Sequence, residues 1–365
     1  MICRSLELMR WALRGWRRRV WYVAGTDRRW SFYWDAYYIT KGLRQRCGLQ
    51  ARVTANPWKL RRQIIHFGDR YAFLNGPSQT LHESNHVFLT WFHGGPDSPD
   101  PEMRRLFLDL VGAADGLNKV VVSCRISEEI LTRGGIAASK VERIPLGVDL
   151  ARFAPPTPRD RAAARAELGI PAGAVCVGSF QKDGVGWDDG NEPKLVKGPD
   201  VFVDAAAKLF ARHRNLIVLL TGPARGYVKQ GLDAAGVPYV HRFLSEYPQI
   251  VRCYHALDLY IISSRMEGGP KALLESWATG VPLVSTRVGM SADLIEHGRN
   301  GMLAEVEDAD ALAEHASGLI EEASLREACR REALGAVRVY DWALIAEQHY
   351  EKLYRPALEG RARRG

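Results

Sequence analysis

The segment 263–289, SSRMEGGPKALLESWATGVPLVSTRVG, decides the fold because it joins the end of one apolar strand to a helix and a second strand. Pro270 suits the first position of a helix, since its φ is fixed and it has no N–H to leave unpaired. Gly280 suits the end of that helix, and Pro282 follows two residues later. The segment therefore predicts a helix over 270–279 whose N-terminus faces the carboxyl edge of a parallel sheet.

Two glutamates, Glu267 and Glu275, stand eight positions apart in this segment. A helix N-terminus holds anions, and Gly268 and Gly269 let the backbone approach a phosphate or sugar closely. Glu275 lies among apolar helix residues, where a carboxylate is costly to bury unless donors meet it; the two hydroxyls of a ribose would do so. A second interpretation stays open, in which Glu267 favours the helix dipole and Glu275 bonds to a neighbouring element.

The rest of the chain repeats the alternation of apolar strands and helices, which is typical of parallel sheets covered on both faces. A Pro-rich joint, FAPPTPRD (153–160), separates two such runs. The prediction is an α/β protein with two doubly wound, Rossmann-like domains facing a central cleft, where ligands usually bind. We expect the following parts: a basic extension (1–19), an N-terminal domain (20–152), a linker (153–172), a C-terminal domain (173–341) and a C-terminal helix crossing back to the first domain (342–358).

Composition limits the functional classes. Of the 365 residues, 46% are hydrophobic and 25% charged, and no run of 18 uncharged apolar residues predicts a membrane span. The six cysteines are scattered without a CxxC pair, which indicates reduced thiols in a cytoplasmic protein and neither a disulfide framework nor a metal site.

The net charge of +8 belongs to the two ends of the chain, so we expect no nucleic-acid groove. Residues 1–19 are rich in arginine, and apolar residues recur there at helical spacing (Leu6, Met9, Leu13, Trp16). One interpretation is a helix lying on the inner face of a membrane. The other is a solvated or dispensable extension. Arg10 and Arg14 interrupt the apolar core that a secretory signal would need.

These motifs resemble glycosyltransferase family 4, the retaining glycosyltransferases of GT-B fold also called glycosyl transferases group 1. EGGPKALLE (267–275) resembles the E-x7-E motif of that family. Four further segments resemble it in the same order: 144–155, 195–209, 287–320 and 342–354. The resemblance extends over about 20–356 and is strongest over 140–350.

The resemblance implies a role for each matching residue. Glu275 would hold the nucleotide ribose, Glu267 the donor sugar and Lys197 the diphosphate. A preorganised cation there would stabilise the leaving nucleoside diphosphate without a metal. The other donor-binding positions implied are Gly268, Gly269, Pro270, Lys271, Ala272 and Leu273.

The sequence departs from the family in the loop after 174–180. Where the family commonly has an arginine, this chain reads Gly178-Ser179-Phe180, and the nearest cation is Lys182. Lys182 is either its substitute or a solvated loop lysine. The extended loop DGVGWDDGNEPKL (183–195) does not have calcium-loop spacing. It is either a lid or acceptor loop around Trp187, or a surface insertion.

In the first domain, His93 follows the strand-like segment 86–92 and by the resemblance would approach the reacting carbon of the donor. A structural hydrogen-bonding role is the alternative. Gly25 matches a glycine loop near the donor phosphates. The aromatic residues of 30–38 would stack on an acceptor sugar or pack against the sheet (Trp30, Phe32, Tyr33, Trp34, Tyr37, Tyr38).

The function expected from this resemblance is a hexosyltransferase of EC class 2.4. It would move a hexose from UDP- or GDP-hexose to a glycan or lipid-linked acceptor with retention, needing no cofactor and no metal. Two alternatives stay open: a sugar-nucleotide epimerase of the same architecture, and a degenerate protein that only binds nucleotide sugar.

Overall fold

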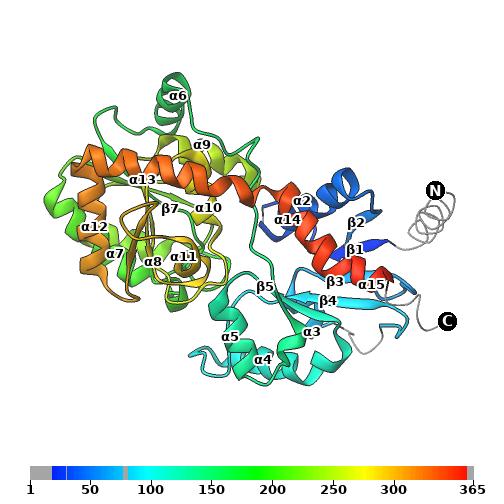
Figure 1. Ribbon diagram of the computed structural model, residues 1–365. Coiled ribbons are helices and arrows are strands. Elements are labelled where there is room, and N and C mark those ends of the chain that lie inside the picture. The colour runs from blue at the N-terminus through cyan, green and yellow to red at the C-terminus, as the bar shows by residue number, and fades with distance from the viewer. Residues whose placement is uncertain (1–18, 30, 77–80, 360–365) are drawn as a thin grey trace. The chain divides into compact units, whose positions relative to one another are not determined.

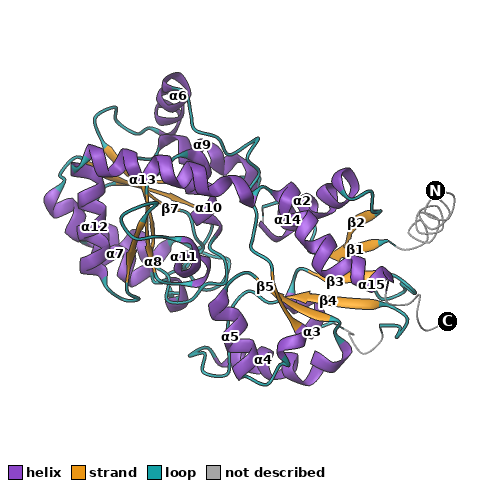
Figure 2. Cartoon of the chain, in the orientation of Figure 1, coloured by secondary structure: helices purple, strands orange, loops and turns teal. Residues whose placement is uncertain are grey.

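The computed structural model describes residues 19–29, 31–76 and 81–359. The chain forms two compact units, one of Met1–Gly147 with Trp342–Gly365 and one of Val148–Asp341. Each unit has parallel strands connected by helices (Figure 1 and Figure 2). The helix expected within 1–19 lies almost wholly outside the described residues. No helix in the described part of the chain combines the length and apolar character needed to span a membrane.

The first unit contains a parallel sheet with strand order β2-β1-β3-β4-β5-β6. Its strands are β1 (Val20–Val23), β2 (Ala51–Thr54), β3 (Ile64–Phe67), β4 (His86–Thr90), β5 (Lys119–Val122) and β6 (Val141–Arg143). Its helices are α2 (Ser31–Arg46), α3 (Arg70–Leu74), α4 (Pro101–Ala113), α5 (Arg125–Arg133), α14 (Trp342–His349) and α15 (Arg355–Glu359). Short 3₁₀ turns lie at η2 (Ala114–Gly116) and η3 (Ala138–Lys140), and a π-helical turn, η7 (Tyr350–Tyr354), separates α14 from α15.

The end of the chain is part of the first unit because α14 packs on α2. A Cβ on Gly42 of α2 would collide with the Cβ of Ala346, so a glycine is needed for this close approach. Tyr38 of α2 stacks on Trp342 with ring centroids 6.0 Å apart. The aromatic run of α2 therefore supplies core contacts, which favours the packing interpretation for its buried members Trp34 and Tyr38. Trp30 lies outside the described residues.

The second unit has a parallel sheet of order β12-β11-β10-β7-β8-β9. Its strands are β7 (Val175–Ser179), β8 (Leu216–Thr221), β9 (Tyr239–Arg242), β10 (Leu259–Ile262), β11 (Leu283–Thr286) and β12 (Met302–Ala304). Its α-helices are α6 (Pro158–Leu168), α7 (Pro199–Arg212), α8 (Gly226–Ala234), α9 (Ile250–Ala256), α10 (Lys271–Thr279), α11 (Gly289–Leu294), α12 (Ala309–Glu321) and α13 (Ala323–Ala336). Three 3₁₀ turns complete it: η4 (Leu195–Lys197), η5 (Tyr247–Gln249) and η6 (Val337–Tyr340).

The order of these strands indicates where a ligand site is expected. β7 pairs with β8 on one side and β10 on the other, so the chain reverses its direction of winding between β7 and β10. Ligands of open α/β sheets bind at the carboxyl ends of the strands beside such a reversal. Apolar residues of β8 pack with those of α7 and α12 in one buried core (Val218, Leu220, Phe202, Leu209, Leu312, Leu319).

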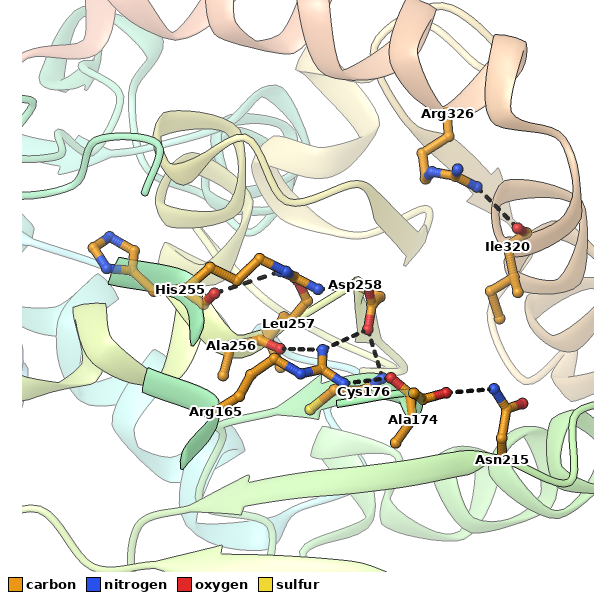
Figure 3. A network of polar contacts seen from close by, with 12 residues as sticks. Arg165, Ala174, Cys176, Asn215, His255, Ala256, Leu257, Asp258, Ile320 and Arg326 are labelled. Carbon is orange, nitrogen blue, oxygen red and sulfur yellow. Dashed lines mark hydrogen bonds and ion pairs between the residues drawn. The ribbon is translucent and has the colours of Figure 1, made fainter. Parts of the chain in front are cut away.

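The Pro-rich segment leads into helix α6, which begins at Pro158 with a Thr157–Asp160 capping box. Figure 3 shows Arg165 of this helix pointing toward Asp258, which precedes β10. Arg165 donates to the Ala256 carbonyl and to Asp258, each at 3.1 Å, and Asp258 accepts the Cys176 N–H at 2.8 Å. Part of the segment 153–172 is therefore a helix held to the amino ends of the two central strands β7 and β10 of the second sheet.

Candidate active site

Helix α10 and the loop before it form the centre of the site. The expected helix between two strands is confirmed, but it begins at Lys271, because Pro270 has ψ 113° and takes the N-cap position instead of the first helical one. Gly280 ends the helix in the left-handed region at φ 70°, as expected. The preceding loop is packed tightly, since a Cβ on Gly289 of α11 would collide with the Gly268 carbonyl.

The structure brings Lys197 and Glu267 together from distant parts of the sequence. Lys197 Nζ lies 2.6 Å from Glu267 Oε1, and the two side chains are 18% and 11% exposed. The Ser264 hydroxyl also donates to Glu267 Oε1, at 3.0 Å. A largely desolvated ion pair thus lies between the end of η4 and the loop after β10, where a charge acts through a lower effective dielectric than in water.

Gln181 connects the two sides of this site, and the sequence analysis missed it. Its amide donates to the Lys197 carbonyl at 2.7 Å, and its side-chain oxygen accepts the Ser264 hydroxyl at 3.1 Å. Gln181 and Ser264 follow β7 and β10 directly, at the carboxyl ends of neighbouring strands. Their position next to those strand ends is the sequence signal that could have identified both residues.

Glu275 is buried, with only 4% of its surface exposed, and both of its oxygens accept tyrosine hydroxyls. Tyr247 of η5 donates to Oε1, and Tyr254 of α9 donates to Oε2 at 2.8 Å. Burial raises the pKa of Tyr254 well above its usual value, so its hydroxyl remains a donor, and the nearby Glu275 charge adds to that effect. The structure therefore supplies hydrogen-bond partners for the interpretation in which Glu275 bonds to a neighbouring element. The spacing of the sequence did not indicate that these partners are Tyr247 and Tyr254.

Lys182 lies in the extended loop, where its Nζ is 4.5 Å from the centre of the Trp187 ring. Desolvation lowers the pKa of Lys182, while Trp187 is 62% exposed. The loop folds back as a short hairpin, with Gly184 bridged to Pro193 and the Val185 N–H bonded to the Glu192 carbonyl at 2.9 Å. Lys182 is therefore held against an exposed aromatic ring at the start of this hairpin.

Asp183 is not part of a metal-binding site in this loop. Its carboxylate is fully buried, and Oδ1 lies 2.9 Å from Arg225 Nε. Burial raises the pKa of Asp183, and the Arg225 charge opposes that shift. Within the described residues, no cluster of three or more His, Cys, Asp or Glu side chains is arranged to hold a metal ion.

His93 and Gly25 belong to the first unit and are not part of the cluster in the second. His93 lies in the loop after β4, and its carbonyl accepts a hydrogen bond from Arg70. Gly25 is exposed directly after β1, and a Cβ there would meet nothing within 4 Å. Its surroundings therefore do not require a glycine, and both roles remain predictions.

Comparison with known proteins agrees with this fold. The family model of glycosyl transferases group 1 matches residues 193–335, which include Lys197, Glu267 and Glu275. D-inositol 3-phosphate glycosyltransferase of Corynebacterium jeikeium is 29% identical over 270 residues, covering 71% of this chain and 61% of the relative. The namesake from Saccharomonospora viridis is 34% identical over 240 residues, covering 60% of this chain and 51% of the relative. The chain thus spans about three fifths or less of the length of these curated relatives.

Solved structures match over a larger share of the chain. HepE of Anabaena, in complex with UDP and glucose, has a TM-score of 0.73 at 19% identity, covering 92% of this chain and 99% of that one. Sucrose-phosphate synthase of Thermosynechococcus elongatus has a TM-score of 0.67 at 19% identity, covering 81% of this chain and 74% of that one.

The two Rossmann-like units are those of the GT-B fold, as expected from the sequence. The match of the glycosyl transferases group 1 model to residues 193–335 confirms the resemblance over that part of the chain.

Proposed function

We propose that this protein is a retaining glycosyltransferase that transfers a hexose from a nucleoside diphosphate sugar to an acceptor hydroxyl. The observation that carries the proposal is the desolvated Lys197–Glu267 pair beside the N-terminus of α10, with Glu275 buried in the same helix. The names of the relatives and the UDP-glucose complex of HepE support a glycosyl donor of this class, with UDP-hexose as the first to test.

In the proposed reaction, the bond between the anomeric carbon and the donor phosphate oxygen breaks, and a bond to the acceptor oxygen forms on the same face. Negative charge then develops on the leaving nucleoside diphosphate. Lys197, with Lys182 as second cation, stabilises that charge, which is the preorganised electrostatic role that most lowers such barriers. The acceptor proton passes to the leaving phosphate. Glu267 and the backbone of 268–273 orient the sugar.

The acceptor we propose is a hydroxyl of a glycan or lipid-linked glycan at the cytoplasmic face of a membrane, to which residues 1–19 would bind. The names of the relatives add inositol phosphate as an acceptor to test. No metal is required in this scheme, so EDTA should leave donor binding unchanged.

The test is transfer from UDP-glucose and GDP-hexoses, with and without EDTA, in wild type, Lys197→Gln and a control. Lys197→Gln should lower kcat/KM by about 10²- to 10³-fold, because it removes a preorganised charge at the leaving group. Lys208→Gln is the matched control, since Lys208 is a partly exposed lysine of α7 that pairs with Asp204 and Asp310. Near-normal turnover in Lys197→Gln would contradict the proposal. An epimerised nucleotide sugar formed without acceptor would favour the epimerase, and donor binding without transfer would favour the binding protein.

A further inference from the structure

The two tyrosine partners of Glu275 differ in their freedom to move. Tyr254 is fully buried and stacks on Tyr260 at 5.6 Å, and the Phe180 ring contacts it edge-on at 5.0 Å. Displacing it would disturb the core of the second unit. Tyr247 is only partly buried and lies on the short turn η5 after an exposed loop. Of the two tyrosines, Tyr247 is therefore the one that a ligand could displace.

The side chains around Tyr247 place it beside the start of α10. Lys271 Nζ, from the first residue of that helix, lies 5.8 Å from the centre of the Tyr247 ring. The Tyr247 ring also lies 6.4 Å from that of Phe153. Since Glu275 is almost completely buried, with Tyr254 in the core, Tyr247 is its partner on the exposed side.

We infer that the Tyr247 hydroxyl and the ribose of the donor nucleotide compete for Oε1 of Glu275, so that Tyr247 sets the affinity of the site for nucleosides. The inference rests on the proposed function, which assigns the ribose to Glu275. A ribose hydroxyl that reaches Oε1 must replace the hydrogen bond from Tyr247. The free energy of binding then gains only the difference between the ribose hydrogen bond and the tyrosine hydrogen bond. Hydrogen bonds to a charged acceptor are among the stronger ones in proteins, so this exchange has a measurable cost.

The inference predicts that two chemically identical substitutions affect nucleotide affinity differently. Tyr247→Phe removes the competing hydroxyl and leaves Oε1 to the ribose, so nucleotide affinity should rise. Tyr254→Phe removes a donor from Oε2 inside the core, where the ribose does not replace it, so affinity should fall or stay the same. Both substitutions should lower the melting temperature of the free protein, because each leaves a buried carboxylate oxygen with one partner fewer.

The experiment is isothermal titration of the full chain with UDP, GDP, ADP and inorganic pyrophosphate. We expect Tyr247→Phe to bind the preferred nucleoside diphosphate about tenfold more tightly than wild type, which corresponds to about 1.4 kcal/mol. Its affinity for pyrophosphate, which has no ribose, should not change. The matched controls are Tyr254→Phe and Glu275→Gln, the latter expected to weaken nucleotide binding.

Each outcome separates the inference from the proposed function. If Glu275→Gln weakens nucleotide binding but Tyr247→Phe binds no more tightly than wild type, the competition is wrong and the ribose site stands. If Glu275→Gln binds nucleotide as wild type does, the ribose assignment fails and the inference fails with it. An equal gain for pyrophosphate would also overturn the inference, since the effect would then not involve the ribose. If no nucleoside diphosphate binds to wild type or Tyr247→Phe, both proposals fall.

Discussion

Arg225 and Asp183 form an ion pair whose side chains have no exposed surface. Arg225 also donates to the carbonyls of Ser179 and Thr221, at 2.7 and 3.0 Å, so it ties the ends of β7 and β8 to the extended loop. From the sequence, this loop was expected to be either a lid or acceptor loop around Trp187, or a surface insertion. The structure instead uses the first carboxylate of that loop as an internal anchor, because a buried arginine 42 positions later meets it.

We predict that Arg225→Met lowers the free energy of unfolding by about 3–5 kcal/mol, because it leaves Asp183 buried without its cation. Arg299→Met is the matched control: the side chains of Arg299 and its partner Glu296 are 61% and 63% exposed, so the loss of this pair should cost far less stability. Urea unfolding measures both. Equal losses in the two variants would show that the buried pair has no special role in stability.

The individual residues of the candidate site show how much of it could be predicted from the sequence. The local signals around the helix at 270–279 indicated Glu267 and Glu275 as candidates, and the resemblance to glycosyltransferase family 4 added Lys197. The hydrogen-bond partners of these residues come from other segments: Ser264, Gln181, Tyr247 and Tyr254. A single sequence does not indicate which of its many polar residues will meet a given carboxylate.

At the scale of elements, the junction of η4 and α7 positions Lys197. Gly198 follows it in the left-handed region at φ 60°, and the Ser263 hydroxyl donates to the Gly198 carbonyl at 2.9 Å. A Cβ on Gly198 would collide with the backbone carbonyl of Ser263. The helix beginning at Pro199 was expected from the sequence, whereas this contact with the end of β10 was not, because it joins elements more than 60 residues apart.

We expect Gly198→Ala to lower stability by more than the roughly 1–2 kcal/mol of left-handed strain alone, and to reduce the proposed transferase activity as well. The collision is with backbone, so η4 must shift and carry Lys197 with it. Gly222→Ala is the control, because Gly222 also has positive φ, 84°, but a Cβ there meets nothing within 4 Å. Thermal unfolding and kcat/KM measure the two effects. The same loss in both variants would contradict the role of close packing at Gly198.

At the scale of the whole molecule, the chain leaves the first unit after Gly147 and returns to it at Trp342. The returning segment carries Tyr354, whose hydroxyl bonds to His66 Nδ1 of β3 at 2.6 Å, while His66 Nε2 bonds to Thr90 at 2.8 Å. His349 of α14 is also buried, with its ring 5.4 Å from that of His66. The first unit is therefore closed by a segment that buries two histidines.

The two buried histidines predict that the folded protein loses stability in acid. Burial lowers the pKa of His66 well below its usual value and that of His349 to about 3, so the folded form holds both neutral. The unfolded chain takes up these protons below about pH 6.5, and the stabilisation is complete above that pH. As pH falls from 6.5 toward 3, stability should drop by up to about 1.4 kcal/mol per pH unit for each histidine.

Urea unfolding between pH 7.5 and 4.5 tests this expectation. His349→Gln should flatten the pH dependence by one proton relative to wild type. An unchanged slope in His349→Gln would show that the closing segment is not the source of the acid sensitivity.

The sequence by itself indicated the α/β class, the two runs of strands and helices, and a helix over 270–279 that in the structure begins one residue later. These features depend on periodicity, capping and spacing within a few residues, so local physical preferences are enough to define them. The resemblance to glycosyl transferases group 1 rests on the same local motifs, and the match over 193–335 confirmed it.

Only the tertiary structure decided which charges meet and which segments close each unit. It paired Lys197 with Glu267, Glu275 with two tyrosines and Asp183 with Arg225, and it returned α14 to the first unit. These partners are separated by between 21 and 70 residues, and α14 reaches α2 across about 300. Such contacts form because the cooperative packing of two sheets and their helices places strand ends side by side, and short-range sequence preferences do not contain that information.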